Sequence, residues 1–192
     1  LVILQAKKEK IYYQQFAGNE LWKSLKASQK LIRLDEIINL NNPEKTFHIG
    51  FMSNKNSWHP PVLWIGIGCE RNTPKEFIKK NLKKVLERNN LSSLSIAGLA
   101  TIELKQDENA ILEISKDNNW PIKFFSLEEL FNVSVPNPSE IVFKEIGTSS
   151  VAEASSILAA GVGSNLILEK NVFKNNGFGA VTIAISKSMK QF

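Results

Sequence analysis

The chain has 192 residues, of which 43% are hydrophobic and 22% charged, and its formal net charge is +5 at pH 7. These values are typical of one folded domain, or of one domain with a fragment of another, and they exclude a disordered protein. No apolar run reaches the roughly 20 residues that a membrane helix needs, so an integral membrane protein is excluded. One cysteine and two histidines exclude a disulfide framework and predict no metal site, and a reduced, cytoplasmic location is expected.

The distribution of the charge argues against nucleic-acid binding. Residues 1–60 carry 9 basic and 5 acidic residues, whereas residues 61–192 carry 15 and 14 and are nearly neutral. Only three of the basic residues are arginine, and aromatic residues are not interleaved with them. Readers of double-stranded DNA depend on arginine forks, and binders of single strands depend on interleaved aromatic residues. The sequence therefore favours neither kind of partner.

The first 60 residues have few turn signals and make a poor independent core. Two prolines at the end of Ser57–Pro61 block both helix and central strand, which predicts a linker there. We interpret residues 1–60 as the tail of an incomplete upstream domain plus this linker, and residues 61–192 as a second domain. The missing initiator methionine agrees with a piece of a longer chain. The elements predicted upstream are strands at Leu1–Gln5, Ile11–Phe16 and Thr46–Phe51, and a helix at Asn19–Asn39.

From Val62 onward, strands alternate with helices. The continuous apolar run Val62–Gly68 is typical of a strand covered on both faces. Thr73–Glu76 and Ser126–Glu129 have the spacing of capping boxes, which predicts a helix start at each. The predicted strands are 62–68, 95–104, 122–125, 166–169 and 181–186, and the predicted helices are 74–89, 107–116, a short one after 126, 139–145 and 151–160.

The end of the chain predicts an antiparallel hairpin, because only a segment containing the turn residues Asn175–Gly177 separates the last two strands. Gly161 and Gly163 are expected to end the preceding helix. Together the elements predict an α/β fold of three layers, α/β/α. Its mixed, mostly parallel sheet has five strands and ends in the antiparallel hairpin.

The first candidate site is the loop Gly66–Thr73, which joins the first strand of this sheet to a helix. Open α/β sheets bind ligands at the carboxyl ends of their strands, and amide groups at a helix start suit a carboxylate or phosphate. Gly66, Gly68, Arg71 and Thr73 are therefore candidate binding residues. Arg71 takes the place of the third glycine of a dinucleotide fingerprint, which argues against a nucleotide-binding domain. The alternative is a tight turn with a solvated arginine.

The second candidate site is the loop Gly147–Glu153, which leads into a helix rich in small residues. The hydroxyl groups of Ser149 and Ser150 and the helix start are expected to hold an anion while Glu153 serves as acid or base. The alternative is a capping box, in which the Glu153 carboxylate returns a hydrogen bond to the Ser150 amide. The two interpretations are compatible.

Two more side chains have open interpretations. Cys69 lies in the first loop, but a nucleophilic cysteine needs a nearby base, and both histidines lie upstream. A buried structural thiol is therefore favoured. Lys170 follows an apolar strand, where it is either a cation facing a ligand or simply the end of the strand.

Six blocks of sequence resemble the carboxy-terminal domain of CbiG, which is shared with the stand-alone protein CobE of cobalamin biosynthesis. The resemblance covers about residues 62–188, and the order of the blocks makes it more specific than any one of them. One departure is that Glu70 and Asn72 stand where the family commonly has a basic or small residue. The blocks are Trp64–Thr73, Ile96–Ile102, Phe125–Leu130, Gly147–Ala154, Leu168–Lys170 and Val181–Ile185.

The resemblance implies a role in corrin-ring synthesis. CbiG is the cobalt-precorrin-5A hydrolase, which opens the ring lactone and releases acetaldehyde, whereas CobE is implied to bind or channel corrinoid intermediates without a settled reaction. The implied ligand is a cobalt-precorrin with several carboxylates, so the cobalt belongs to the substrate and no cofactor is expected. A fused or associated precorrin methyltransferase is an implied partner. Glu153 is the implied base, and the implied binding residues are Gly66, Gly68, Cys69, Arg71, Thr73, Ser149, Ser150 and Lys170.

Overall fold

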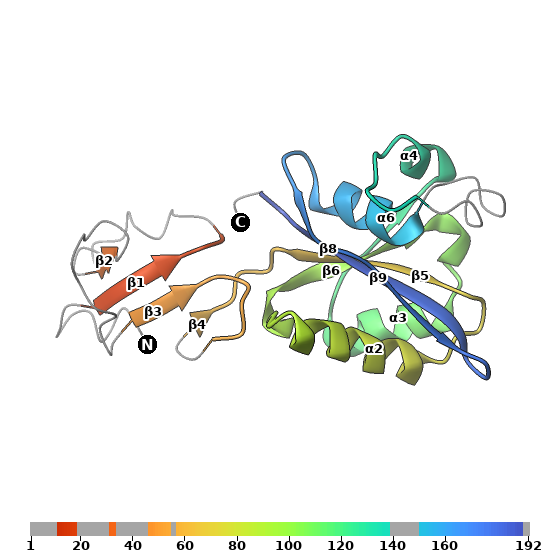
Figure 1. Ribbon diagram of the computed structural model, residues 1–192, viewed down its shortest axis with the longest axis horizontal. Helices are drawn as coiled ribbons and strands as arrows, with labels where there is room; N and C mark the ends of the chain where they lie inside the picture. The colour runs from red at the N-terminus through yellow and green to blue at the C-terminus, as the bar shows by residue number, and fades with distance from the viewer. Residues whose placement is uncertain (1–10, 19–30, 34–45, 55–56, 139–149, 190–192) are drawn as a thin grey trace.

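Two β-sheets organise the protein (Figure 1). The computed structural model describes residues 11–18, 31–33, 46–54, 57–138 and 150–189. The predictions for Leu1–Gln5, Ser139–Glu145 and Gly147–Ser149 lie outside the described residues.

The smaller sheet has four parallel strands in the order β2-β1-β3-β4. Its strands are β1 (Ile11–Gln15), β2 (Leu31–Arg33), β3 (Thr46–Ile49) and β4 (Ser57–Trp58). The predicted helix over Asn19–Asn39 is wrong at β2, because pairing with β1 overrides the local helical pattern there. The predicted linker is also wrong at its first two residues, which pair with β3. The two prolines that follow β4 do end the sheet as expected.

The larger sheet confirms the predicted mixed sheet of five strands. Its strands are β5 (Leu63–Cys69), β6 (Ile96–Ile102), β7 (Ile122–Phe125), β8 (Asn165–Asn175) and β9 (Gly179–Lys187). They lie in the order β7-β6-β5-β9-β8. Strands β5, β6 and β7 pair in parallel, and β9 runs antiparallel to both β5 and β8. Four strands therefore point one way, and the hairpin places β9 between two of them.

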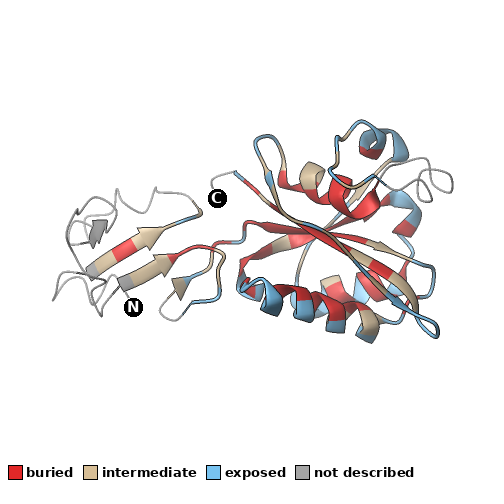
Figure 2. Ribbon diagram, in the orientation of Figure 1, coloured by how far each residue is buried: buried red, intermediate tan, exposed pale blue. Residues whose placement is uncertain are grey.

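Helices cover both faces of the larger sheet and complete the three predicted layers (Figure 1). Helices α2 (Lys75–Arg88) and α3 (Asn109–Asn118) pack on one face, while α4 (Leu127–Phe131) and α6 (Val151–Ala160) lie on the other. Short 3₁₀ turns at Ser93–Ser95 and Glu103–Lys105 flank β6. Buried residues concentrate on the central strands and on the helix faces turned toward them (Figure 2).

The two predicted capping boxes have different outcomes. The Ser126 amide donates to Glu129 at 2.7 Å, and the Glu129 amide donates to the Ser126 hydroxyl at 3.2 Å, which confirms that box. The box at Thr73 is wrong, because α2 begins one residue later than its spacing requires, with Pro74 as the N-cap. The Thr73 hydroxyl instead donates to the Glu70 carbonyl at 2.9 Å and closes the turn before the helix.

Helix α6 lies very close to the sheet because its inner face has only small side chains. A Cβ atom built on Gly66 of β5 would lie 1.8 Å from the Ala152 carbonyl oxygen. The Ser155 hydroxyl donates to the Ala100 carbonyl at 3.2 Å, and the Ser156 and Ser186 hydroxyls are 2.8 Å apart. Close packing and buried hydrogen bonds therefore fix this helix on β5, β6 and β9.

The smaller sheet is joined to the larger unit beside the turn that precedes β6. The Ser92 amide donates to the Phe51 carbonyl at 2.9 Å, and the Ser53 amide donates to the Asn90 carbonyl at 2.8 Å. Because residues 90–95 lead into β6, these bonds lie at the amino ends of the parallel strands. The candidate loops come from the opposite edge of the sheet.

Candidate functional site

The end of β5, which belongs to the first predicted loop, adjoins the start of α6, which belongs to the second, at one edge of the larger sheet. A Cβ atom built on Gly68, near the end of β5, would lie 3.7 Å from the Cβ of Val151 at the start of α6. Gly66 faces Ala152 in the next part of the helix, so α6 runs back along β5 from this edge. The carboxyl end of β5 and the amino end of α6 therefore adjoin.

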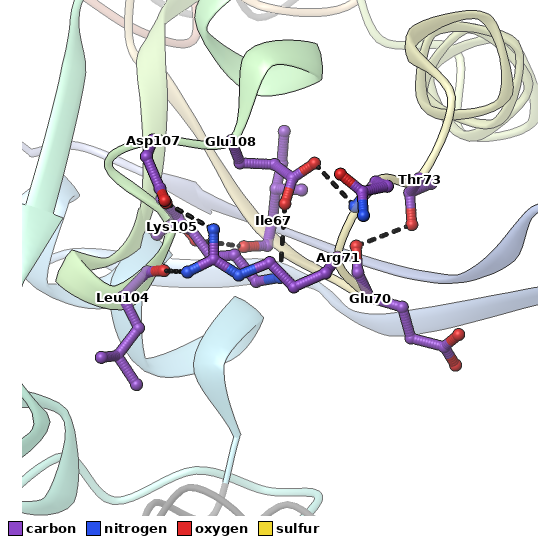
Figure 3. Close-up of polar contacts among 10 residues, drawn as sticks. Ile67, Glu70, Arg71, Thr73, Leu104, Lys105, Asp107 and Glu108 are labelled. Carbon is purple, nitrogen blue, oxygen red and sulfur yellow. Dashed lines mark hydrogen bonds and ion pairs between the residues drawn. The ribbon is translucent and has the colours of Figure 1, made fainter.

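Donor groups of the first loop, the Arg71 guanidinium and the Asn72 amide, bind carboxylates of the protein itself (Figure 3). Arg71 forms an ion pair with Asp107 at 2.5 Å and donates to the Leu104 carbonyl at 2.6 Å. The Asn72 amide donates to Glu108 Oε1 at 3.1 Å. These acceptors follow β6, more than 30 residues away along the chain.

A ligand anion at this loop has to share its cationic groups with carboxylates of the protein. A cavity of about 370 Å³ beside it is lined by two cationic and three carboxylate side chains, which are Arg71, Lys75, Asp107, Glu108 and Glu113. The Arg71 guanidinium donates a hydrogen bond that holds the pKa of Asp107 below its usual range, so that carboxylate stays ionised. Glu108 is buried and forms an ion pair with Lys105 at 3.5 Å. A ligand carboxylate binding in this cavity has to compete with these groups.

Cys69 has the properties of a structural thiol. Burial raises the pKa of its thiol to about 11 from an ordinary value of 9.0, although the nearby Lys105 ammonium acts in the opposite direction. At neutral pH the group is therefore a neutral thiol, and only the thiolate is an effective nucleophile. This observation favours the structural interpretation over a covalent role.

Slow alkylation of Cys69 is therefore expected. Below pH 9 its thiolate fraction is about 100-fold smaller than that of an ordinary cysteine, and its partial burial slows access further. The reaction of the native chain with iodoacetamide at pH 8, followed by mass spectrometry, measures this directly. The same chain unfolded in urea is the control, since it contains no other cysteine. Equal rates in the folded and unfolded chains would contradict the burial of the thiol.

The second loop carries a fully buried carboxylate. Ser150 caps α6 by accepting a hydrogen bond from the Glu153 amide at 3.4 Å, which is half of the predicted capping box. The Glu153 side chain does not complete the box. Its Oε1 accepts hydrogen bonds from the Lys170 amide and from the Asn137 side chain, both at 3.0 Å. The alternative in which Glu153 only caps its own helix is therefore wrong for the carboxylate.

The other carboxylate oxygen of Glu153 is unpaired. Glu153 has an exposed fraction of 0%, and its Oε2 has no hydrogen-bond partner among the residues that the structure describes. Buried polar atoms are nearly always satisfied in folded proteins, so an open acceptor at a helix start points to a missing donor. A water molecule or a ligand hydroxyl is a donor of the kind that this oxygen requires.

An irregular strand brings Lys170 to this carboxylate. In the β8–β9 pair, Leu168 is opposite Ile185 and Asn171 is opposite Ile183, so β8 has one extra residue in between. Such a bulge takes an amide out of the ladder and re-aims it. The Lys170 amide donates to Glu153, and its ammonium group donates to the Asn137 carbonyl. The interpretation of Lys170 as a plain strand end is therefore incomplete.

Asn137 is not among the residues predicted for the site from the sequence. It lies in the connecting segment Val135–Pro138, where prolines indicated only a loop. Its side chain donates to Glu153 Oε1 and also to Glu169 Oε2, the second at 2.8 Å. Nothing in the local pattern signals this contact, because both acceptors lie at least 16 residues away.

Comparison with known proteins decides the family. The model of the family described as cobalamin synthesis G C-terminus matches residues 63–186, which is more than half of the chain. The chain belongs to this family. The match contains β5, α6 and the bulged strand β8, and with them Asn137, Glu153 and Lys170. The described residues contain no helix able to cross a membrane and no cluster of side chains suited to a metal ion.

Two curated relatives and one crystal structure place the chain within the family. It is 33% identical over 135 residues to the cobalt-precorrin-5A hydrolase of Priestia megaterium, covering 70% of this chain and 34% of that protein. It is 31% identical over 112 residues to protein CobE of Sinorhizobium sp, covering 57% and 73%. A crystal structure of CobE, from the cobalamin (vitamin B12) biosynthetic pathway, superposes with a TM-score of 0.60 at 25% identity, covering 67% and 95%. The chain thus spans about a third of the Priestia hydrolase.

The remaining predicted binding residues stay predictions. Ser149 lies outside the described residues, and Ser150 is buried as the cap of α6. Gly66 and Gly68 are within β5, where Gly66 makes room for the backbone of α6. The Thr73 hydroxyl is used by the turn, and Arg71 keeps about half of its side chain exposed at the rim of the cavity.

Proposed function

We propose that this chain binds a cobalt-precorrin and is the carboxy-terminal part of a cobalt-precorrin-5A hydrolase, to which it contributes Glu153 as the base. The observation that carries the proposal is the buried Glu153 carboxylate with one open oxygen, in a chain of the cobalamin synthesis G family. In this proposal residues 61–192 form the corrinoid-binding domain, and residues 1–60 belong to the preceding region of the same cytoplasmic protein.

The proposed chemistry is hydrolysis of the ring lactone. Water donates a hydrogen bond to Glu153 Oε2, which takes its proton as the oxygen attacks the lactone carbonyl carbon. The lactone carbon–oxygen bond then breaks, and the leaving alkoxide recovers the proton from Glu153. The product has one new carboxylate, whose proton goes to solvent, and one new hydroxyl. The bond between the hydroxyl-bearing carbon and the ring carbon then breaks. The hydroxyl loses its proton and becomes the carbonyl of acetaldehyde, while the electron pair stays on the ring carbon, which takes up a proton. Cobalt enters and leaves as part of the substrate.

The corrinoid carboxylates need several binding points around this centre. The described contacts use Arg71 Nη1 and Nη2 once each, so the guanidinium retains N–H groups for a ligand. Ser150 lies at the amino end of α6, where the helix dipole favours an anion. We assign Arg71, Thr73, Ser149, Ser150 and Lys170 to substrate binding. The residues Gly66, Gly68 and Cys69 shape the end of β5 beneath them.

A binding module without catalysis is the second candidate. The observation that favours it is that this chain corresponds to 95% of the CobE structure but to only 34% of the Priestia hydrolase. In that case the chain would hold a corrinoid intermediate and pass it to a fused or associated precorrin methyltransferase. Glu153 would then bind a donor group of the ligand instead of activating water.

A titration of the purified chain with cobalt-precorrin-5A, followed by visible absorbance and by an assay for acetaldehyde, tests both candidates. A spectral change together with acetaldehyde supports the hydrolase. A spectral change alone supports the binding module. No spectral change would contradict corrinoid binding by this chain and with it both candidates.

Weaker binding is expected for Arg71→Ala in the same titration. We expect the dissociation constant to rise about fivefold, which corresponds to the roughly 1 kcal/mol of an exposed ion pair. Arg88→Ala, at the exposed far end of α2, is the matched control and should bind like the wild type. Equal affinities for the two variants would remove Arg71 from the binding site.

A further inference from the structure

The Asn137 side chain connects two carboxylates in different environments. Its Nδ2 atom donates to Glu153 Oε1 at 3.0 Å and to Glu169 Oε2 at 2.8 Å. Glu153 is fully buried, whereas Glu169 is exposed. An amide nitrogen has two hydrogens, and here each of them is given to a different carboxylate. Both hydrogens of the Asn137 amide nitrogen are therefore engaged in hydrogen bonds.

We propose that Asn137 is a positioning residue that holds the Glu153 carboxylate in the orientation that leaves Oε2 open. The terminal torsion of a glutamate side chain is broad, so the carboxylate turns easily unless its oxygens are held. The Lys170 amide alone supplies one donor to Oε1, and Asn137 supplies a second from another direction. With Oε1 held twice, Oε2 is the acceptor left for a donor from outside. The role of Asn137 in the hydrolysis reaction rests on the proposed function.

The side chain and the backbone of Asn137 make different contacts. The positioning of Glu153 by the side chain can therefore be tested separately from the attachment of the connecting segment. The Lys170 ammonium group donates to the backbone carbonyl of Asn137, and this contact ties the connecting segment to β8. The contact does not involve the Asn137 side chain, so it is retained in every side-chain variant. Changing the side chain therefore removes the donor to Glu153 and leaves the attachment of the segment in place.

Hydrogen exchange of the Lys170 amide tests the positioning without any substrate. In the wild type this amide is protected by Glu153, not by the ladder, because it lies in the bulge. In Asn137→Leu, which has no donor, the carboxylate is free to turn, and the amide should exchange about tenfold faster in NMR spectra. The β8 amides that pair with β9 should keep their rates. Asn137→Asp, which removes the same donors with almost no change in size, is the second variant.

The matched control is Asn132→Leu. The Asn132 side chain is exposed and donates to the Glu128 backbone carbonyl at 3.0 Å, in the same connecting region but away from Glu153. It should leave the exchange of the Lys170 amide unchanged. If Asn137→Leu and Asn137→Asp also leave it unchanged, the positioning role is overturned, whatever the activity of the chain.

Kinetics test the same role in the reaction. A misplaced base costs the chemical step more than binding, so kcat for acetaldehyde release should fall about 10- to 100-fold in Asn137→Leu with KM nearly unchanged. A rise in KM at constant kcat would make Asn137 a binding residue and overturn the proposal. Faster exchange with unchanged kcat would overturn it as well. A wild-type chain that releases no acetaldehyde defeats the hydrolase function, while the exchange experiment still decides whether Asn137 positions Glu153.

Discussion

Replacing Glu153 by glutamine is expected to lower the rate of acetaldehyde release from cobalt-precorrin-5A by about 10²- to 10⁴-fold, the range that a general base contributes. Glutamine has nearly the same shape, and its carbonyl oxygen accepts the same hydrogen bonds from Lys170 and Asn137. The fold and the affinity for the corrinoid should therefore remain. What is lost is an oxygen able to take a proton from water.

The matched control for this variant is Glu169→Gln. Glu169 is the other carboxylate that Asn137 contacts, but it is exposed and lies outside the start of α6. We expect this variant to retain activity within about threefold of the wild type, as surface substitutions usually do. Rates of acetaldehyde release and a thermal melt for each variant decide the matter. Equal losses in the two variants, or no loss in Glu153→Gln, would exclude Glu153 as the base.

Replacing Gly66 by alanine is expected to destabilise the fold strongly. The added Cβ would lie 1.8 Å from the Ala152 carbonyl oxygen and 3.0 Å from the Ser156 side chain, so the helix backbone has to move. Overpacking of this kind costs about 3 kcal/mol or more of the free energy of unfolding, and the melting temperature should fall by roughly 10 °C. Thermal unfolding followed by circular dichroism measures the change.

Gly68→Ala is the matched control, two residues along the same strand. Its Cβ would meet Thr182 and Val151 at 3.7 Å, which is ordinary van der Waals contact. We expect a change in the free energy of unfolding within about 0.5 kcal/mol. If the two variants melt together, α6 is not held against β5 as closely as the structure has it. The comparison therefore tests the packing that brings Glu153 to the edge of the sheet.

Much of the larger unit could be predicted because its signals are local. The apolar run that became β5, the capping box at Ser126 and the glycine that ends α6 each act over a few residues. Gly161, the C-cap of α6, and Gly163, in the turn after it, have positive φ angles of 86° and 77°, which glycine adopts without strain. The prediction for the upstream part was wrong where strand pairing determines the secondary structure, because nothing within Leu31–Arg33 indicates that β1 lies beside it.

The candidate site was predictable only in part. Glu153 stands out because it lies in the first turn of a capped helix, although the same spacing also fits an ordinary capping box. Its partners do not stand out, since the Asn137 contact is long-range and the Lys170 amide is turned by a bulge that only the pairing with β9 defines. The first loop shows the same limit. Its Arg71 guanidinium donates to Asp107 and its Asn72 amide donates to Glu108, and no sequence motif connects these two carboxylates with the loop.

The position of β9 has a consequence for synthesis of the protein. Val181, Ile183 and Ile185 of this strand are fully buried, and β9 bonds to β5 on one side and to β8 on the other. A nascent chain that stops before Gly179 therefore has two strand edges with exposed backbone groups and lacks the buried side chains of β9 between the helix layers. Such edges invite aggregation, and contacts between distant segments form slowly. The larger sheet can close only after these residues have been synthesised.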